Sequence, residues 1–144
     1  MDDALAAERP VPRWYLAAAI ASLLFMLIGV WGFFMDVATD PHSLSPDQQA
    51  LWLARPTWMK VAYGAAVWMG AAGAVLLLTR SRLAEPVLLV SLAATVLTFL
   101  PYAIVPEVRS AVATSDVAAG VIVILVVALI CGFARRARQR GWLQ

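Results

Sequence analysis

The sequence predicts an all-α membrane protein: a four-transmembrane-helix bundle with a short interfacial helix in the first outer loop. Two observations predict this fold class. The chain is 62% hydrophobic and only 14% charged, which makes it more apolar than a soluble domain of its length. The apolar residues also form four uninterrupted runs, each close to the roughly 20 residues that a helix needs to cross a bilayer. We therefore expect one transmembrane domain over residues 1–144.

Short polar segments separate the four expected spans. The spans cover residues 14–35, 58–79, 86–105 and 117–134. Met1 to Pro12 carries mixed charges, and we expect it to be largely disordered. No convincing small-residue cleavage site follows the first run, so that run is predicted to be a retained anchor rather than a signal peptide.

The basic residues are distributed unevenly between the two sides of these spans. Eight lie on the side that carries both termini, and three, Arg55, Lys60 and Arg109, lie on the other. Cytoplasmic loops are enriched in Lys and Arg, so both termini are predicted to be cytoplasmic. The terminal RRARQR run is interpreted as a stop-transfer flank attracted to anionic lipid, and no nucleic-acid partner is expected.

The first span carries its small and polar residues on one stripe, which should face other helices because small residues allow close approach in lipid. The stripe consists of Ala18, Ser22, Met26, Gly29, Phe33 and Asp36. It ends with an acid at the outer rim.

The first outer loop contains a helix start at Ser45. Serine can cap the free N–H groups, Pro46 suits the first helical position, and Gln48 completes a capping box. Pro56 must end this helix, so an interfacial helix is predicted over residues 46–54, with Trp52 in the headgroup layer. The segment serves either as a connector or as a lid over a binding site.

The second span carries a groove of small residues at helical spacing, in which another helix should lie. The groove consists of Ala62, Ala66, Gly70 and Gly73, with Trp68 roughly opposite. Lys60 lies at the outer rim, where it either pairs with Asp36 or remains solvated without a partner.

Hydroxyl groups recur along one face of the third span, at Ser91, Thr95, Thr98 and Tyr102. They act either as structural hydrogen bonds within and between helices or as a polar ligand path. Pro101 predicts a kink or an early end, because proline removes a backbone hydrogen bond.

The last span is apolar on all sides and is expected to be the most lipid-exposed, with Thr114 or Ser115 as its cap. Cys131 is expected to pack as a small apolar residue.

Three spans should bring charged and aromatic residues to one outward-facing mouth. The candidate binding residues there are Asp36, Trp52, Lys60 and Tyr102. A closed, hydrogen-bonded rim would give the same sequence pattern.

The sequence shows no pattern typical of a cofactor site, a metal site or a catalytic site. The one histidine, His42, lies outside the spans, so haem held by two histidines is not expected, and neither is any other cofactor or metal site. No Walker loop and no catalytic set of carboxylates or Ser, His and Asp is found. An enzyme is therefore not expected.

Pro56-Thr57-Trp58 and the run from Ala66 to Gly73, followed by Leu76 to Leu78 and Arg80, carry a resemblance to a known group. The chain resembles uncharacterised small four-helix bacterial inner-membrane proteins, some of them loosely labelled sugar transporters. The resemblance implies the bacterial inner (plasma) membrane as the location. Members of the group tend to have Trp-Asn where this chain has Phe25 and Met26, and an acid near Gly32.

These observations lead to two functional hypotheses. The first is a small non-enzymatic integral membrane protein that acts through contacts with a partner or with the lipid bilayer, and that forms a homo-oligomer. The alternative is a small solute transporter or permease subunit for a sugar-like molecule. Its path would follow the hydroxyl groups of the third span.

Overall fold

A computed structural model describes residues 10–144, and it confirms an all-α bundle of four long apolar helices. The expectation for the first nine residues lies outside the described part of the chain. The helices are α1 (Arg13–Ala38), η2 (Pro41–Ser43), α2 (Pro46–Ala54), α3 (Thr57–Leu78), α4 (Ala84–Phe99), α5 (Pro101–Ile104), α6 (Pro106–Ala111) and α7 (Thr114–Gln139).

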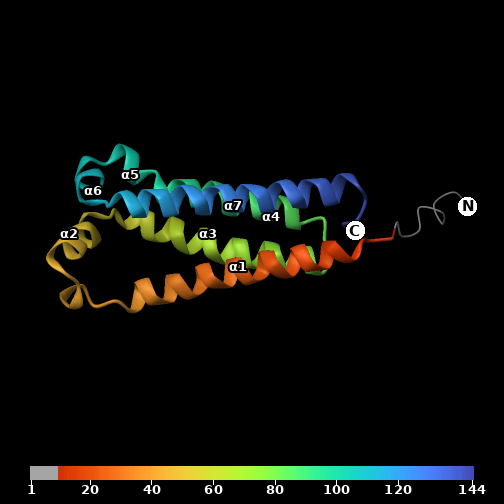
Figure 1. The fold of residues 1–144 in the computed structure, drawn as a ribbon, viewed down its shortest axis with the longest axis horizontal. Coiled ribbons are helices and arrows are strands. Elements are labelled where there is room, and N and C mark those ends of the chain that lie inside the picture. The colour runs from red at the N-terminus through yellow and green to blue at the C-terminus, as the bar shows by residue number, and fades with distance from the viewer. Residues whose placement is uncertain (1–9) are drawn as a thin grey trace, which may run out of the picture.

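The four long helices run side by side along the molecule (Figure 1). Helices α3 and α4 pack against each other over their length, α1 packs on α3, and α7 packs on α4. We call the end with residues 39–56 and 100–113 the loop end. The opposite end, with the turn at residues 79–83 and both ends of the described chain, is the terminal end.

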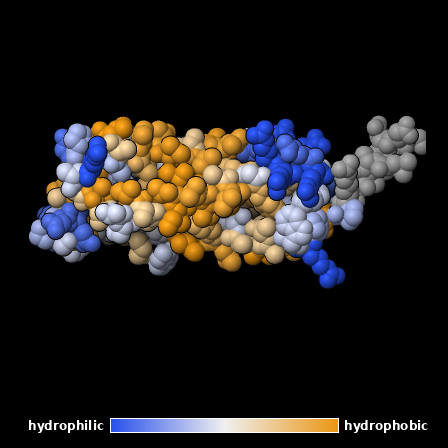
Figure 2. Space-filling model, turned by 45° about the horizontal axis from the view of Figure 1, so that its top comes forward, coloured by the Kyte–Doolittle hydropathy of each residue, from blue (hydrophilic) through white to orange (hydrophobic). Residues whose placement is uncertain are grey.

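On the face that Figure 2 shows, the surface of the bundle is apolar in its middle and hydrophilic at both ends. Large apolar side chains point outward from all four helices, among them Ile28, which is 70% exposed, and Leu129, which is 73% exposed. Exposed apolar surface on this scale is stable only in a bilayer, and each of the four helices is long and apolar enough to cross one. The chain is an integral membrane protein.

The predicted groove on α3 is the main packing surface of the bundle. Ala66, Gly70 and Gly73 are buried, whereas Trp68 on the other side is 51% exposed. A Cβ atom at Gly70 would lie 2.6 Å from the sulfur of Met26, and one at Gly73 would lie 2.6 Å from the Leu88 side chain. Glycine at these two positions therefore lets α1 and α4 approach the α3 backbone closely.

The regular helix of the third span ends at the position that Pro101 led us to expect. Helix α4 stops at Phe99, and the short helix α5 begins at Pro101. The proline lacks an N–H and cannot continue the hydrogen-bond ladder, so the chain changes course at the loop end.

Among the short helices at the loop end, α2 was predicted from the sequence and α6 was not. Helix α2 has the expected bounds, and the capping box of Ser45 and Gln48 is present, with 3.4 Å between the Ser45 nitrogen and Gln48 Oε1. Helix α6 was not predicted. It packs on α2, so α2 does not lie alone on the bundle surface. Both helices begin with a proline, which needs no partner for an N–H.

Two expectations about α7 are wrong. Its N-cap residue is Ala113, which makes no side-chain hydrogen bond, because Thr114 and Ser115 already lie within the first turn. Helix α7 is also not the most exposed span: 28% of its most apolar window is buried, against 17% for α1. Helix α7 packs small residues on α4, and Cys131 is buried with its Sγ 3.2 Å from the Leu88 carbonyl oxygen. Helix α1 has only α3 as a close neighbour over its length.

The terminal end is closed by hydrogen bonds and aromatic contacts. The Tyr15 hydroxyl donates to the Leu77 carbonyl at 2.6 Å, and Arg80 Nε donates to the Trp142 carbonyl at 2.9 Å. Arg138 forms an ion pair with Glu85 at 2.9 Å, so the basic run also joins α7 to the start of α4. Tyr15, Phe133 and Trp142 pack together, which fixes α1 beside α7 at this end.

Candidate binding cavity between the four helices

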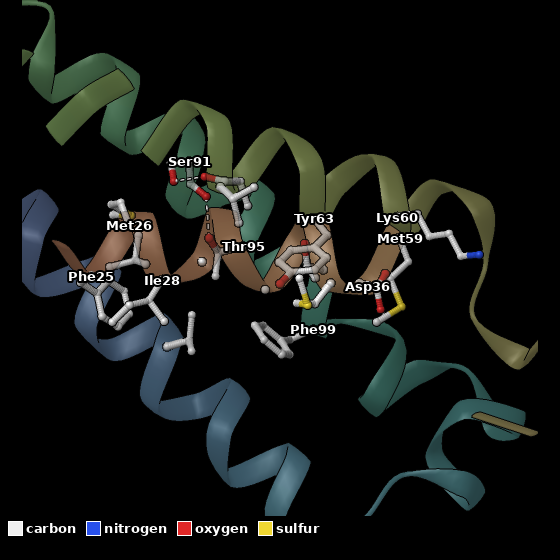
Figure 3. A pocket seen from close by; sticks show the side chains of 18 of the residues that line it. Phe25, Met26, Ile28, Asp36, Met59, Lys60, Tyr63, Ser91, Thr95 and Phe99 are labelled. Atoms are coloured by element: carbon white, nitrogen blue, oxygen red, sulfur yellow. Dashed lines mark hydrogen bonds between the residues drawn. The ribbon is translucent and has the colours of Figure 1, made fainter. Parts of the chain in front are cut away.

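A cavity of about 500 Å³ lies between the four long helices and extends to the loop end (Figure 3). Residues from α1, α3, α4, α5 and α7 line it, together with Thr39 and Arg55 from the first loop. This volume is within the roughly 300–1,000 Å³ that is usual for sites that hold small molecules.

The inner part of the cavity is lined mainly by apolar side chains, with the hydroxyl groups of Ser91 and Thr95 among them. Phe25 and Met26 of α1, Val67 of α3, and Val123 and Val127 of α7 line this part. Helices α1 and α7 lie further apart toward the loop end (Figure 1). In Figure 3 the side chains of Phe25 and Ile28 lie on the side of the cavity that faces α7. The cavity thus reaches the space between α1 and α7.

The hydroxyl groups predicted on α4 line the cavity, and all three donate to backbone carbonyls. Ser91 bridges to the Ala66 carbonyl of α3 at 2.7 Å. Thr95 and Thr98 donate to carbonyls within α4, each at 2.8 Å. Their protons are therefore used structurally, and what they offer a ligand is their oxygen lone pairs.

Asp36 lines the mouth of the cavity, but its partner is Arg55 and not Lys60. Arg55 Nη1 donates to Asp36 Oδ1 at 2.9 Å, and both side chains are 21% exposed. Of the two alternatives considered for Lys60, pairing with Asp36 is therefore wrong. The reason is that Arg55 follows α2 directly and is held beside Asp36 where the loop returns to α3.

Lys60 is held by an aromatic ring. Its Nζ lies 3.7 Å from the centre of the Trp52 ring, and its side chain extends toward the loop end in Figure 3. Within residues 10–144, neither of the ion pairs involves Lys60. Lys60 lines the cavity but Trp52 does not, so Trp52 covers the ammonium group rather than the mouth itself.

Two tyrosines complete the mouth. Tyr102, predicted from sequence, lines the cavity from α5 with its ring 5.7 Å from that of Phe99. Tyr63 of α3 points into the cavity, and a Cβ atom at Gly32 would lie 2.9 Å from its hydroxyl oxygen. Among the described residues neither hydroxyl is hydrogen-bonded, so both are available to a ligand.

The structure brings together three of the four residues predicted for the mouth, Asp36, Lys60 and Tyr102. Sequence reasoning missed Arg55 and Tyr63. Tyr63 lies three residues after Lys60, which places it on the same helix face, so its position could have been found from spacing. The position of Arg55 depends on how the loop folds, and the conformation of a loop cannot be predicted from a periodic sequence pattern.

The site shows no cluster suited to a metal. Within residues 10–144, no group of three or more His, Cys, Asp or Glu residues could hold an ion. The buried polar atoms without a partner there are Trp52 Nε1 and Arg55 Nε, both at the mouth of the cavity or next to it.

No protein-family profile, no curated protein and no solved structure matches the chain.

Proposed function

We propose that this chain is a non-enzymatic integral membrane protein that binds one amphiphilic molecule in the cavity. The apolar part of the ligand lies between α1 and α7, and its polar end lies among Asp36, Arg55 and Lys60. The observation that carries the proposal is the change of polarity along one cavity, which is uncharged and mainly apolar in the middle of the bundle and charged at the loop end.

The charges at the mouth favour a polar end that is anionic. Among the charged residues that line the cavity, Asp36 and Arg55 neutralise each other, which leaves the charge of Lys60 in excess. Arg55 has a further buried donor, Nε, without a partner within residues 10–144. A carboxylate or phosphate group could accept from Arg55 and Tyr63, and Lys60 would attract it.

The position of the cavity supports access from the bilayer. Phe25 and Ile28 of α1 and Val123 and Val127 of α7 line the side that reaches the space between these two helices. An amphiphile already dissolved in the membrane can enter there without crossing water.

A sugar-like solute remains the second candidate, because Ser91, Thr95 and Thr98 all line the cavity. Against it stands the use of all three hydroxyl protons by backbone carbonyls. A sugar would need many donors and acceptors in the apolar half of the cavity, and an amphiphile would not.

We place the protein in the bacterial inner membrane with both termini in the cytoplasm. The support is that Arg55, Lys60 and Arg109 are the three basic residues at the loop end, whereas the other basic residues of the described chain lie at the terminal end. The cavity mouth then faces away from the cytoplasm.

The test is ligand binding by the full chain in lipid nanodiscs, with a fluorescent long-chain fatty acid as the probe. Saturable binding is expected, and Val123→Trp should abolish it by filling the cavity. Val121→Trp is the matched control, because Val121 lies on the same helix, is 52% exposed and does not line the cavity. Equal binding by both variants would refute the proposal. Uptake of labelled glucose by proteoliposomes, with no fatty-acid binding, would favour the solute transporter.

A further inference from the structure

A second hollow of about 430 Å³ lies at the terminal end, away from the cavity. Trp14 of α1 and Trp142 line it, together with Leu129, Gly132 and Arg136 on one face of α7 and with Arg140 directly after this helix. We call it the terminal groove. It shares no residue with the lining of the cavity.

The lining of the terminal groove changes from apolar to basic along α7. Gly132, Arg136 and Arg140 are spaced by four, so they follow one another on one face with about 6 Å of rise between each pair. Leu129 lies at the apolar end and is 73% exposed, so the groove joins the apolar middle of the surface. The two arginines lie at the other end.

Within the described part of the chain, neither of the two arginines forms an ion pair. Within residues 10–144 the ion pairs are Asp36 with Arg55 and Glu85 with Arg138. The Arg140 guanidinium carbon lies 5.1 Å from the centre of the Trp142 ring, which orients the group and leaves its donors free.

The groove is open beside Gly132. A Cβ atom built there would meet no other atom within 4 Å, in contrast to Gly70 and Gly73, whose Cβ atoms would collide with neighbours. The rings of Trp14 and Trp142 pack edge to face at 5.4 Å and form the opposite side. An apolar chain could therefore lie along α7 between Gly132 and the indole rings.

We propose that the terminal groove is a binding site for one anionic phospholipid. Its phosphate lies between Arg136 and Arg140, and one acyl chain lies along Gly132 and Leu129. Basic pockets between transmembrane helices suit anionic headgroups, and the adjoining apolar surface selects a lipid over a soluble phosphate. The site does not depend on the ligand proposed for the cavity.

The test is native mass spectrometry of the full chain in detergent, titrated with phosphatidylglycerol and with phosphatidylcholine of the same acyl chains. One phosphatidylglycerol should bind in preference to phosphatidylcholine. Arg136→Gln and Arg140→Gln should each weaken its binding about fivefold. Gly132→Leu should weaken it as well, because the leucine fills the space for the acyl chain. Arg135→Gln is the charge-matched control and should leave binding unchanged, because Arg135 is exposed and does not line the groove.

Several outcomes would overturn the proposal. Equal loss in Arg135→Gln and Arg136→Gln would indicate diffuse attraction to a basic surface. Unchanged binding in Gly132→Leu would remove the acyl-chain contact. Competition by soluble glycerol phosphate as strong as that by the lipid would mean that the groove binds phosphate alone. Melting temperatures of all variants distinguish these results from misfolding, and Gly132→Leu should melt like the unaltered protein.

Discussion

The Ser91 hydroxyl of α4 donates a 2.7 Å hydrogen bond to the Ala66 carbonyl of α3, one turn before Gly70. A Cβ atom at Gly70 would lie 2.9 Å from this hydroxyl oxygen, so the glycine and the bond belong to one tight contact. The contact joins the two central helices and forms part of the cavity wall.

Ser91→Ala should destabilise the bundle by about 0.5–1.5 kcal/mol, because it removes an interhelical hydrogen bond in an apolar setting. Thr98→Val should cost less, since the Thr98 bond stays within its own helix and joins no second helix. Unfolding in mixed micelles of mild detergent and dodecyl sulfate measures both. A larger loss in Thr98→Val would contradict this account of the contact.

Gly70→Leu should destabilise the protein by at least about 1–3 kcal/mol, the usual cost of overpacking, because Met26 and Ser91 leave no room for a side chain. Trp68→Ala should cost less, since Trp68 is 51% exposed on the opposite face. Thermal unfolding in detergent compares the two. A neutral Gly70→Leu with a severe Trp68→Ala would mean that the packing face of α3 is assigned wrongly.

The four long helices and α2 could be predicted from the sequence because local rules determine them. The length of the apolar runs predicted the four spans. Pro101 predicted the end of α4, and the capping box at Ser45 predicted the start of α2. The small residues of α3 likewise identified its packing face. These features depend on residues within a few turns of one another.

Apart from the cap of α7 and the unpredicted helix α6, the errors concern contacts between distant segments. Arg55 reaches Asp36 across 19 residues, and α2 packs on α6 across a longer separation. The exposure of α1 depends on which helices lie beside it, and those neighbours cannot be predicted from the composition of α1. Asp36, Lys60 and Tyr102 therefore line one cavity mouth, while the ion pair of Asp36 was assigned to the wrong cation.

Double-mutant cycles should show which of the two cations at the mouth, Arg55 or Lys60, is energetically coupled to Asp36. Asp36→Asn should cost about 1–2 kcal/mol, between the values for exposed and buried pairs, because both partners are 21% exposed. Lys60→Met should cost less than about 1 kcal/mol, the size of a cation–π contact. Coupling is expected between Asp36 and Arg55 and not between Asp36 and Lys60. Strong coupling of Asp36 to Lys60 would show that the ion pair has been assigned to the wrong residue.

Topology can be tested with reporter fusions after Gln48 and after Gln144. The two sites lie at opposite ends of the bundle, and the basic residues gather at the terminal end, so the fusion after Gln144 should report the cytoplasm and the one after Gln48 the other side. Fusions that report the same side would contradict the four-span arrangement. Reversed sides would leave the fold intact but refute the proposed orientation.

The central claim, that an amphiphile occupies the cavity between the four helices, is tested most directly by photolabelling. A long-chain fatty acid with a diazirine in its apolar part would be cross-linked to the full chain in nanodiscs, and the labelled residues identified by mass spectrometry. We predict labelling at Val123 and Val127, which line the cavity, in excess of Val121 and Leu125, which are 52% and 58% exposed on the same helix. Excess unlabelled fatty acid should suppress the first pair and not the second. Labelling of Val121 and Leu125 alone, with no suppression, would contradict the account.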